Sequence, residues 1–358
     1  MQNERLLPLS LQKLDRHLIV LDGFRGLAII LVILYHYLPF FSFGWVGVDL
    51  FFLLSGFLIT GKLIESLKHK DYFRQFYKKR ILRIIPLYYV VLILFFWVMP
   101  VALPSLITYS FTELNYYQWA YWLFAVNFID AFYGWPKNIT LVHFWSLSCE
   151  MQYYLLWPIV VKWLYTKTQV FIFTLLGLIA AALIFRISTF LLLDISGLYR
   201  YVLFFSRMDT FALGAFLYMC YSNLETYFLN SYIKYTGWAV LMLIVFFMFY
   251  YNLRWHFTES MVSTIGYTLN ALLWFSVMFA ALSKPGLLNK ILSAGCFTFL
   301  GKYSYGLYVF HLPVWIVMSK YFSSSYYIAL LAFAITVLIS WVSFHLLEVK
   351  FLRLKVPK

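Results

Sequence analysis

Long apolar runs recur along the whole chain. Each is about twenty residues long, which is the length that an α-helix needs to cross the hydrocarbon core of a bilayer. The pattern predicts about ten membrane spans, at residues 26–43, 45–64, 84–103, 144–165, 170–193, 206–221, 235–251, 262–282, 304–321 and 326–347. No linker interrupts the sequence, so we expect an all-α, polytopic membrane protein. We expect one transmembrane domain over residues 1–358 and no fused soluble domain.

Composition and charge agree with this fold class. The 358 residues are 63% hydrophobic and 12% charged, whereas a soluble domain averages about a quarter charged residues. The net charge is +14, and most Lys and Arg residues fall on one side of the predicted spans, above all in residues 1–25, 62–83 and 350–358. Because Lys and Arg are retained in the cytoplasm, we expect both termini to be cytoplasmic. Anionic membrane lipids explain the charge without nucleic-acid binding.

Neither a cleaved signal peptide nor a metal site is indicated. The first 25 residues lack an apolar core followed by a small-residue cleavage site, so we expect the first span to be retained. Cys149, Cys220 and Cys296 lie singly and show no metal-ligand spacing. The cysteines are therefore expected to be packing residues, with no metal bound.

The first predicted span carries a cation and an imidazole on one helical face. Arg25 and His36 stand eleven residues apart in DGFRGLAIILVILYH. Eleven residues are about three helical turns, which places the two side chains roughly 16 Å apart along the helix axis. An ionisable residue inside a span is costly to bury, so His36 is a candidate functional residue.

The second predicted span adds an acid and a small-residue pair. Asp49 lies about one turn inside the predicted outer end, and Ser55 and Gly56 lie near the middle. If the preceding turn falls near residues 42–44, Asp49 reaches the depth of His36 and can orient its imidazole as a general base. A buried ion pair that only joins two helices is the alternative. Gly56 indicates either a helix break that lines a cavity or close helix packing.

A basic segment, KHKDYFRQFYKKRILRIIP, follows the second span. Arg80 and Arg83, three residues apart, project from nearly one helix face. Together with Arg25 they can bind a phosphate-bearing ligand at the inner membrane surface. The alternative is an ordinary basic cluster that faces lipid phosphates, and charge alone favours this alternative.

A third polar cluster, HFWSLSCEMQYYLLWP, opens the fourth predicted span. Its Glu150 is expected at nearly the same depth in the membrane as His36 and Asp49, so that the three side chains line one cavity. The alternative is that Glu150 only caps the N-terminus of its helix. Aromatic residues in segments 116–122 and 132–135 can stack against sugar rings. Some polar residues suit either packing or substrate binding, and the candidate substrate-binding residues are His143, Trp145, Ser146, Arg207 and His311.

Six segments resemble, in order, the acyltransferase 3 family of inner-membrane O-acyltransferases. They are DGFRGLAIILVILYH, GVDLFFLLSGFLIT, KKRILRIIPLYY, HFWSLSCEMQYYLLWP, RMDTFALGAFL and GKYSYGLYVFHLP, and the resemblance covers residues 20–348. The family's Arg-x10-His pattern falls on Arg25 and His36. Its Arg-x-x-Arg pattern falls on Arg80 and Arg83, and its Ser-Gly-Phe-Leu stretch on residues 55–58. Met151 replaces the usual second acid after Glu150, which argues against a catalytic role at that position.

The resemblance implies a multi-pass protein of the bacterial inner membrane that transfers acetyl from cytoplasmic acetyl-CoA to a hydroxyl of an exported carbohydrate. The donor site then comprises Arg25, Arg80 and Arg83, with Ser55 and Gly56. The catalytic residues are His36 as general base, with Asp49 or Glu150 to orient it. An acetyl-histidine intermediate is an open variant. The implied partners are membrane lipids, a carbohydrate acceptor that is free or lipid-linked, and a separate extracytoplasmic protein where the chain does not complete transfer alone.

A second class of function is also open. His36, Asp49 and Glu150 suit a proton relay in a transporter or exporter of a glycan precursor. No inverted repeat is visible. The three arginines that can bind phosphate, Arg25, Arg80 and Arg83, are predicted on the cytoplasmic side, so the sequence favours the enzyme. It identifies neither the acceptor carbohydrate nor the acyl chain beyond acetyl.

Overall fold

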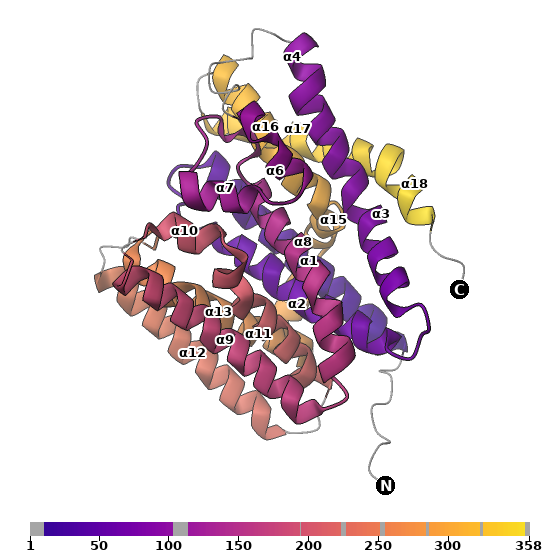
Figure 1. The fold of residues 1–358 in the computed structure, drawn as a ribbon, viewed down its shortest axis with the longest axis vertical. Coiled ribbons are helices and arrows are strands. Elements are labelled where there is room, and N and C mark those ends of the chain that lie inside the picture. Colours follow the sequence, from indigo (N-terminus) through magenta and orange to yellow (C-terminus); the bar gives the residue numbers. More distant parts are fainter. Residues whose placement is uncertain are drawn as a thin grey trace.

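The computed structural model describes residues 11–102, 114–193, 195–222, 227–250, 255–283, 286–322 and 325–354. These residues are mostly helical and contain no strand, which confirms the all-α fold (Figure 1). The first half of the chain forms α1 (Leu11–Tyr37), α2 (Val46–Ser66), α3 (Tyr72–Ile93), η1 (Leu94–Val98), α4 (Met99–Ala102), α6 (Gln118–Trp122), α7 (Val126–Tyr133), η3 (Ile139–Leu141), α8 (Phe144–Leu164) and α9 (Thr168–Leu191). The second half forms α10 (Gly197–Val202), α11 (Phe204–Ser222), α12 (Tyr227–Tyr250), η4 (Val262–Gly266), α13 (Tyr267–Ser283), α14 (Leu287–Leu292), α15 (Gly295–Lys302), α16 (Ser304–Tyr321), α17 (Tyr326–Ser343), η5 (Phe344–Glu348) and α18 (Val349–Arg353).

A helix occupies each segment predicted to span the membrane. Six helical stretches in the described residues are long and apolar enough to cross a bilayer: Ile19–Tyr37, Val46–Ser66, Tyr72–Ala102, Thr168–Leu191, Val262–Ser283 and Tyr326–Arg353. Helices α8, α11, α12 and α16 lie outside this set. In α12 the apolar stretch is the shorter Tyr235–Met248, and the other three helices carry polar residues of the protein interior, among them Ser148, Arg207 and His311. Multiple membrane crossings are thus supported, whereas ten spans remains a prediction.

Several helix boundaries differ from the predicted span ends: α1 ends at Tyr37 and not at residue 43, and α12 begins at Tyr227 and not at residue 235. Helix α1 begins at Leu11 and α3 at Tyr72, well before the apolar runs that predicted them. Backbone hydrogen bonding continues a helix through polar residues, so an apolar run marks the membrane-buried part of a helix and not its first turn. The predicted cytoplasmic ends at residues 1–10 and 355–358, and the span ends at residues 103 and 251, lie outside the described residues.

Helix α2 runs without a break through Ser55 and Gly56, so the predicted interruption is wrong. Gly56 instead allows α2 to approach α11. A Cβ atom at Gly56 would lie 2.2 Å from the Phe211 oxygen, and one at Gly214 would lie 2.1 Å from the Leu53 oxygen. Only glycine permits this backbone approach, which fixes the orientation of the other faces of α2.

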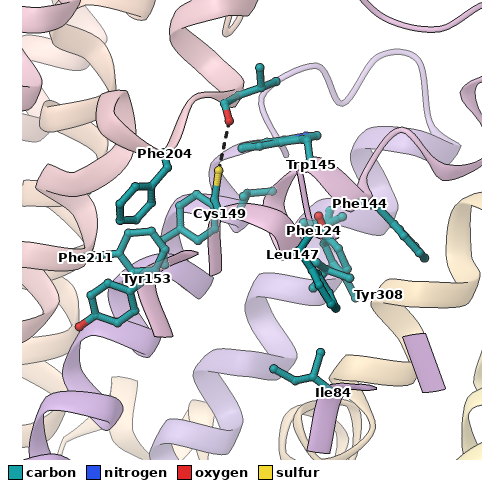
Figure 2. Packing of buried hydrophobic residues seen from close by; sticks show 14 of the residues in the cluster. Ile84, Phe124, Phe144, Trp145, Leu147, Cys149, Tyr153, Phe204, Phe211 and Tyr308 are labelled. Atoms are coloured by element: carbon teal, nitrogen blue, oxygen red, sulfur yellow. Dashed lines mark hydrogen bonds between the residues drawn. The ribbon is translucent and has the colours of Figure 1, made fainter. Parts of the chain in front are cut away.

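Aromatic packing holds α8 against α11 (Figure 2). The Tyr153 ring stacks on Phe211, with ring centroids 4.4 Å apart. The buried Cys149 thiol donates a hydrogen bond to the Val202 backbone oxygen over 3.1 Å, as expected of a packing cysteine. Cys296 is exposed, which contradicts the expectation for that residue. Fixed in this way, α8 presents Ser146, Glu150 and Tyr154 to a cavity.

Reporter fusions test the predicted orientation. A periplasm-dependent phosphatase fused at Lys70, between α2 and α3, is expected to be inactive, because cations hold residues 62–83 in the cytoplasm. The same phosphatase fused at Lys137, between α7 and η3, is expected to be active. Phosphatase activity is measured relative to fusion expression. An active fusion at Lys70 would overturn the predicted orientation.

Candidate active site

Three arginines from two helices meet in one cavity, which we call the arginine cavity. Its empty volume is about 780 Å³, including the part open to solvent. Its polar lining residues are Arg25, Ser55, Arg80, Arg83, Ser146, Glu150, Tyr154, Ser304, Tyr305 and Tyr308. The structure thus brings together the three arginines predicted to bind phosphate, and places Ser55 beside them.

The arginines of this cavity are held by different contacts. Arg25 on α1 forms an ion pair with Asp22 over 2.6 Å and stays partly exposed. The Arg80 guanidinium lies over the rings of Phe76 and Tyr154, each at 5.7 Å from the ring centroid. Arg83 is exposed on the same face of α3. A cluster of cations with free donors is suited to a multiply charged anion.

Glu150 belongs to the arginine cavity and not to the surroundings of His36. Its Oε1 atom accepts hydrogen bonds from the Ser55 hydroxyl, over 2.5 Å, and from the Tyr154 hydroxyl. The Ser55 hydroxyl thereby joins α2 to α8, and the Tyr154 ring lies beside Arg80. The expectation that Glu150 orients His36 is therefore wrong: the two side chains line different cavities and share no hydrogen bond.

His36 lines a second cavity, which we call the histidine cavity; its empty volume is about 740 Å³, including the part open to solvent. His143 and a set of aromatic side chains line it as well: Tyr35, Trp45, Trp135, Trp145, Tyr201, Phe257 and Tyr308. Of the two aromatic segments predicted to contact a sugar, 132–135 contributes Trp135. In the segment 116–122, the backbone oxygens of Tyr121 and Trp122 accept hydrogen bonds from α3, which fixes α6 instead.

The two cavities share a wall. Val48 of α2 and Tyr308 of α16 line both of them. The Tyr308 hydroxyl lies 2.5 Å from Ser146 Oγ and donates to the backbone oxygen of His143 over 3.1 Å. Because α1 is helical from Arg25 to His36, it connects the cavities with a rise of about 16 Å.

A histidine, not an acid, contacts His36. Nδ1 of His36 lies 2.9 Å from the Val32 backbone oxygen and 3.2 Å from Nε2 of His311. A carbonyl oxygen can only accept, so Nδ1 of neutral His36 carries the hydrogen and Nε2 keeps its lone pair. An exposed lone pair on a cavity wall is what a general base or nucleophile needs.

Asp49 faces away from His36, so its predicted role in orienting the imidazole is wrong. The Asp49 carboxylate is fully buried and forms an ion pair with Arg207 of α11. It also accepts a hydrogen bond from the Asn270 amide over 3.3 Å. These contacts join α2 to α11 and α13, so the Asp49 carboxylate stabilises helix packing with partners other than His36.

Arg207 and Gly56 also differ from the roles predicted for them. Arg207 is fully buried, lies 4.1 Å from the Tyr267 ring centroid and lines neither cavity. It therefore has no surface with which to bind a substrate, and Gly56 packs on α11 outside both cavities. His143 and Trp145 line the histidine cavity, and Ser146 the arginine cavity.

Some contacts of the site were missed from the sequence. Tyr308 and Tyr154 were not singled out, although both occur in motifs that carry the resemblance. His311 is fully buried behind His36 and lines neither cavity, which does not fit substrate contact. Among the described residues, no three His, Cys, Asp or Glu side chains are placed to hold a metal ion.

The chain belongs to the acyltransferase 3 family, because a family model for an acyltransferase domain matches residues 18–345. The O-acetyltransferase OatA of Staphylococcus aureus is 28% identical over 361 residues, which cover 93% of this chain and 57% of that protein. The peptidoglycan O-acetyltransferase OatA of Listeria monocytogenes is 35% identical over 161 residues, which cover 40% of this chain and 24% of that protein. No solved structure matches the chain.

The family membership confirms the resemblance inferred from six motifs. The matched part of the chain spans little more than half the length of the Staphylococcus aureus relative. The relatives' names state their activities and not that of this chain.

Proposed function

We propose that the chain is a membrane O-acetyltransferase that uses acetyl-CoA as donor and a carbohydrate hydroxyl as acceptor. The observation that carries the proposal is the shared wall between a cavity lined by three arginines and a cavity lined by His36. A two-substrate transfer requires two sites that meet at the reacting atoms. Membership of the acyltransferase 3 family and two O-acetyltransferase relatives support the same activity.

The donor is assigned to the arginine cavity. The phosphates of acetyl-CoA bind Arg25, Arg80 and Arg83 from the cytoplasmic side, and the pantetheine arm follows α1 toward His36. The distance along α1, about 16 Å, suits an arm that must carry a thioester away from its phosphates. The acetyl group then passes the wall at Val48 and Tyr308.

The acceptor is assigned to the histidine cavity. The partly exposed ring of Trp135 offers a flat face to a sugar ring, and His36 Nε2 accepts the proton of the reacting hydroxyl. The hydroxyl oxygen bonds to the acetyl carbon, the carbon–sulfur bond breaks, and the CoA thiolate takes the proton from the His36 imidazolium. In the acetyl-histidine variant, the same Nε2 attacks the thioester first. The name of the Listeria monocytogenes relative makes peptidoglycan the first acceptor to test.

A proton-coupled glycan exporter is the competing function. It would need a chain of titratable groups across the membrane. Asp49 and Glu150, which would belong to such a chain, form contacts with Arg207 and with two hydroxyls instead of with His36. The structure thus favours the enzyme.

Binding of acetyl-CoA tests the donor site. The Arg80→Ala, Arg83→Ala double variant is expected to weaken acetyl-CoA binding by about 10-fold or more, since a hydrogen bond to a charged group contributes roughly 1.5–3 kcal/mol. The dissociation constant is measured on purified protein by calorimetry. Lys78 and Lys79 lie on the same helix, are exposed and line neither cavity. Their double Ala variant removes the same charge and is expected to bind normally; equal affinities in both variants would contradict the donor site.

A further inference from the structure

His311 on α16 is the side-chain partner of His36 from another helix. Its ring centroid lies 4.9 Å from that of His36 and 4.9 Å from that of His143, and its side chain is fully buried. It lines neither cavity, so it has no access to donor or acceptor. Any contribution of His311 to the reaction must therefore act through a neighbour.

The hydrogen bonds of His311 determine which of its nitrogens can accept. Its Nδ1 lies 2.7 Å from the Tyr308 backbone oxygen, which can only accept, so Nδ1 carries the hydrogen. Nε2 of neutral His311 then has a free lone pair and lies 3.2 Å from Nδ1 of His36, whose single hydrogen is shared between this lone pair and the Val32 backbone oxygen at 2.9 Å. The pair is thus ordered in one direction: His36 donates and His311 accepts.

We propose that His311 is the side-chain positioning residue for His36, in the role predicted for Asp49. Beside the Val32 backbone oxygen, the His311 lone pair accepts the Nδ1–H of His36, keeps the Nε2 atom of His36 directed into the histidine cavity, and stabilises the imidazolium that forms when Nε2 takes a proton. A hydrogen bond strengthens when its donor becomes charged, so this support is greatest in the transition state. The proposal rests on the proposed function, with His36 as base or nucleophile.

The surrounding contacts separate this role from the packing of α16. The Tyr37 hydroxyl donates to the His311 backbone oxygen over 2.9 Å and contacts the Thr336 hydroxyl. Pro313 lacks an N–H, which leaves the Val309 oxygen without its helical donor; Nε2–H of His143 donates to that oxygen over 3.3 Å. Backbone contacts therefore dock α16 on its neighbours without the His311 ring.

Three substitutions at His311 distinguish the two roles. His311→Gln places an amide oxygen near the position of Nε2 and keeps the acceptor. His311→Asn places its amide near Nδ1 and loses the acceptor, and His311→Phe keeps the ring but has no polar atom. We expect kcat to fall about 10- to 100-fold in the Asn and Phe variants, with KM for acetyl-CoA unchanged, and the Gln variant to retain most of kcat.

Acetyl transfer and thermal unfolding are measured for each purified variant, with His345→Gln and His345→Phe as controls at an exposed histidine outside both cavities. A kcat that is higher in the Gln variant, which keeps the hydrogen-bond acceptor, than in the Asn and Phe variants, which lose it, supports the proposal. Wild-type kcat in the Phe variant would overturn it, as would folded Gln and Asn variants with equal loss of kcat. If the Phe variant does not fold, the comparison of Gln with Asn decides.

Failure of this proposal is distinguishable from failure of the proposed function. Loss of activity in His36→Gln together with full activity in His311→Phe would remove only the positioning role. Full activity in His36→Gln would remove the base itself, and the role of His311 with it.

Discussion

His36→Gln is expected to lower the rate of acetyl transfer by about 100-fold or more, which is the contribution typical of a positioned general base. Glutamine fills a similar volume and can donate or accept a hydrogen bond, but it takes up no proton at neutral pH and cannot act as an acyl-accepting nucleophile. The variant is expected to insert in the membrane and to bind acetyl-CoA with normal affinity, because the arginine cavity is lined without His36.

Transfer rate and acetyl-CoA affinity are measured on the same preparation of the His36 variant. His345→Gln serves as the matched control, since this exposed histidine also contacts the backbone oxygen one helical turn earlier. Substantial turnover by folded His36→Gln would contradict both the general-base and the acetyl-histidine mechanisms. Attention would then move to Ser146 and Tyr308 at the shared wall.

Breaking the ion pair between Asp49 and Arg207 is expected to destabilise the protein by about 3–5 kcal/mol, the cost typical of leaving one member of a buried pair uncompensated. Both side chains are fully buried between α2 and α11. Arg207→Met removes the cation and leaves Asp49 with the neutral Asn270 amide as hydrogen-bond donor. Thermal unfolding in detergent is expected to shift to a lower temperature in this variant.

A double variant separates the pair from other effects at the two positions. Asp49→Asn combined with Arg207→Met removes both charges, so its stability is expected to exceed that predicted by adding the losses of the single variants. Additive losses would show that the two side chains do not interact. Normal stability with lost activity in Asp49→Asn would instead restore the catalytic role predicted for Asp49.

The predicted contact between Asp49 and His36 is wrong because Asp49 lies on a different face of α2 from the residues that line the cavity. The sequence fixes the depth of a residue within a span, and Asp49 was paired with His36 on depth alone. On α2, Val48, Phe51 and Ser55 line the arginine cavity, whereas Asp49 and Gly56 face α11. Successive helical residues point about 100° apart. The i, i+3, i+7 spacing of Val48, Phe51 and Ser55 shows that these residues share one helical face. No sequence feature showed that this face lines a cavity.

Local spacing predicted other parts of the site well. Arg25 and His36 share α1, and Arg80 and Arg83 share one face of α3, because each pair lies within a single helix. The contact between His36 and His311 joins residues 275 positions apart, and no local pattern predicts such a contact. Pro313 signals a different contact: a proline inside a span frees a backbone oxygen, here that of Val309, for a side chain such as His143.

The motifs and the packing together explain why the site lies where it does. Gly56 and Gly214 bring α2 close to α11, and aromatic stacking fixes α8 on the same helix. The remaining faces of α2 and α8 then enclose the arginine cavity and meet α16 at Tyr308. Asp49 and Arg207, which were predicted to be catalytic and substrate-binding residues, stabilise the helix packing instead.

Acetyl transfer in the absence of an ion gradient most directly separates an acetyltransferase from an exporter. Purified protein in proteoliposomes is incubated with acetyl-labelled acetyl-CoA and soluble peptidoglycan fragments, and free CoA and label in the glycan are quantified. We expect label in the glycan and an equal amount of free CoA from the wild-type protein, and neither above background from His36→Gln. Intact acetyl-CoA, with glycan crossing the bilayer only when a proton gradient is imposed, would contradict the proposed acetyltransferase.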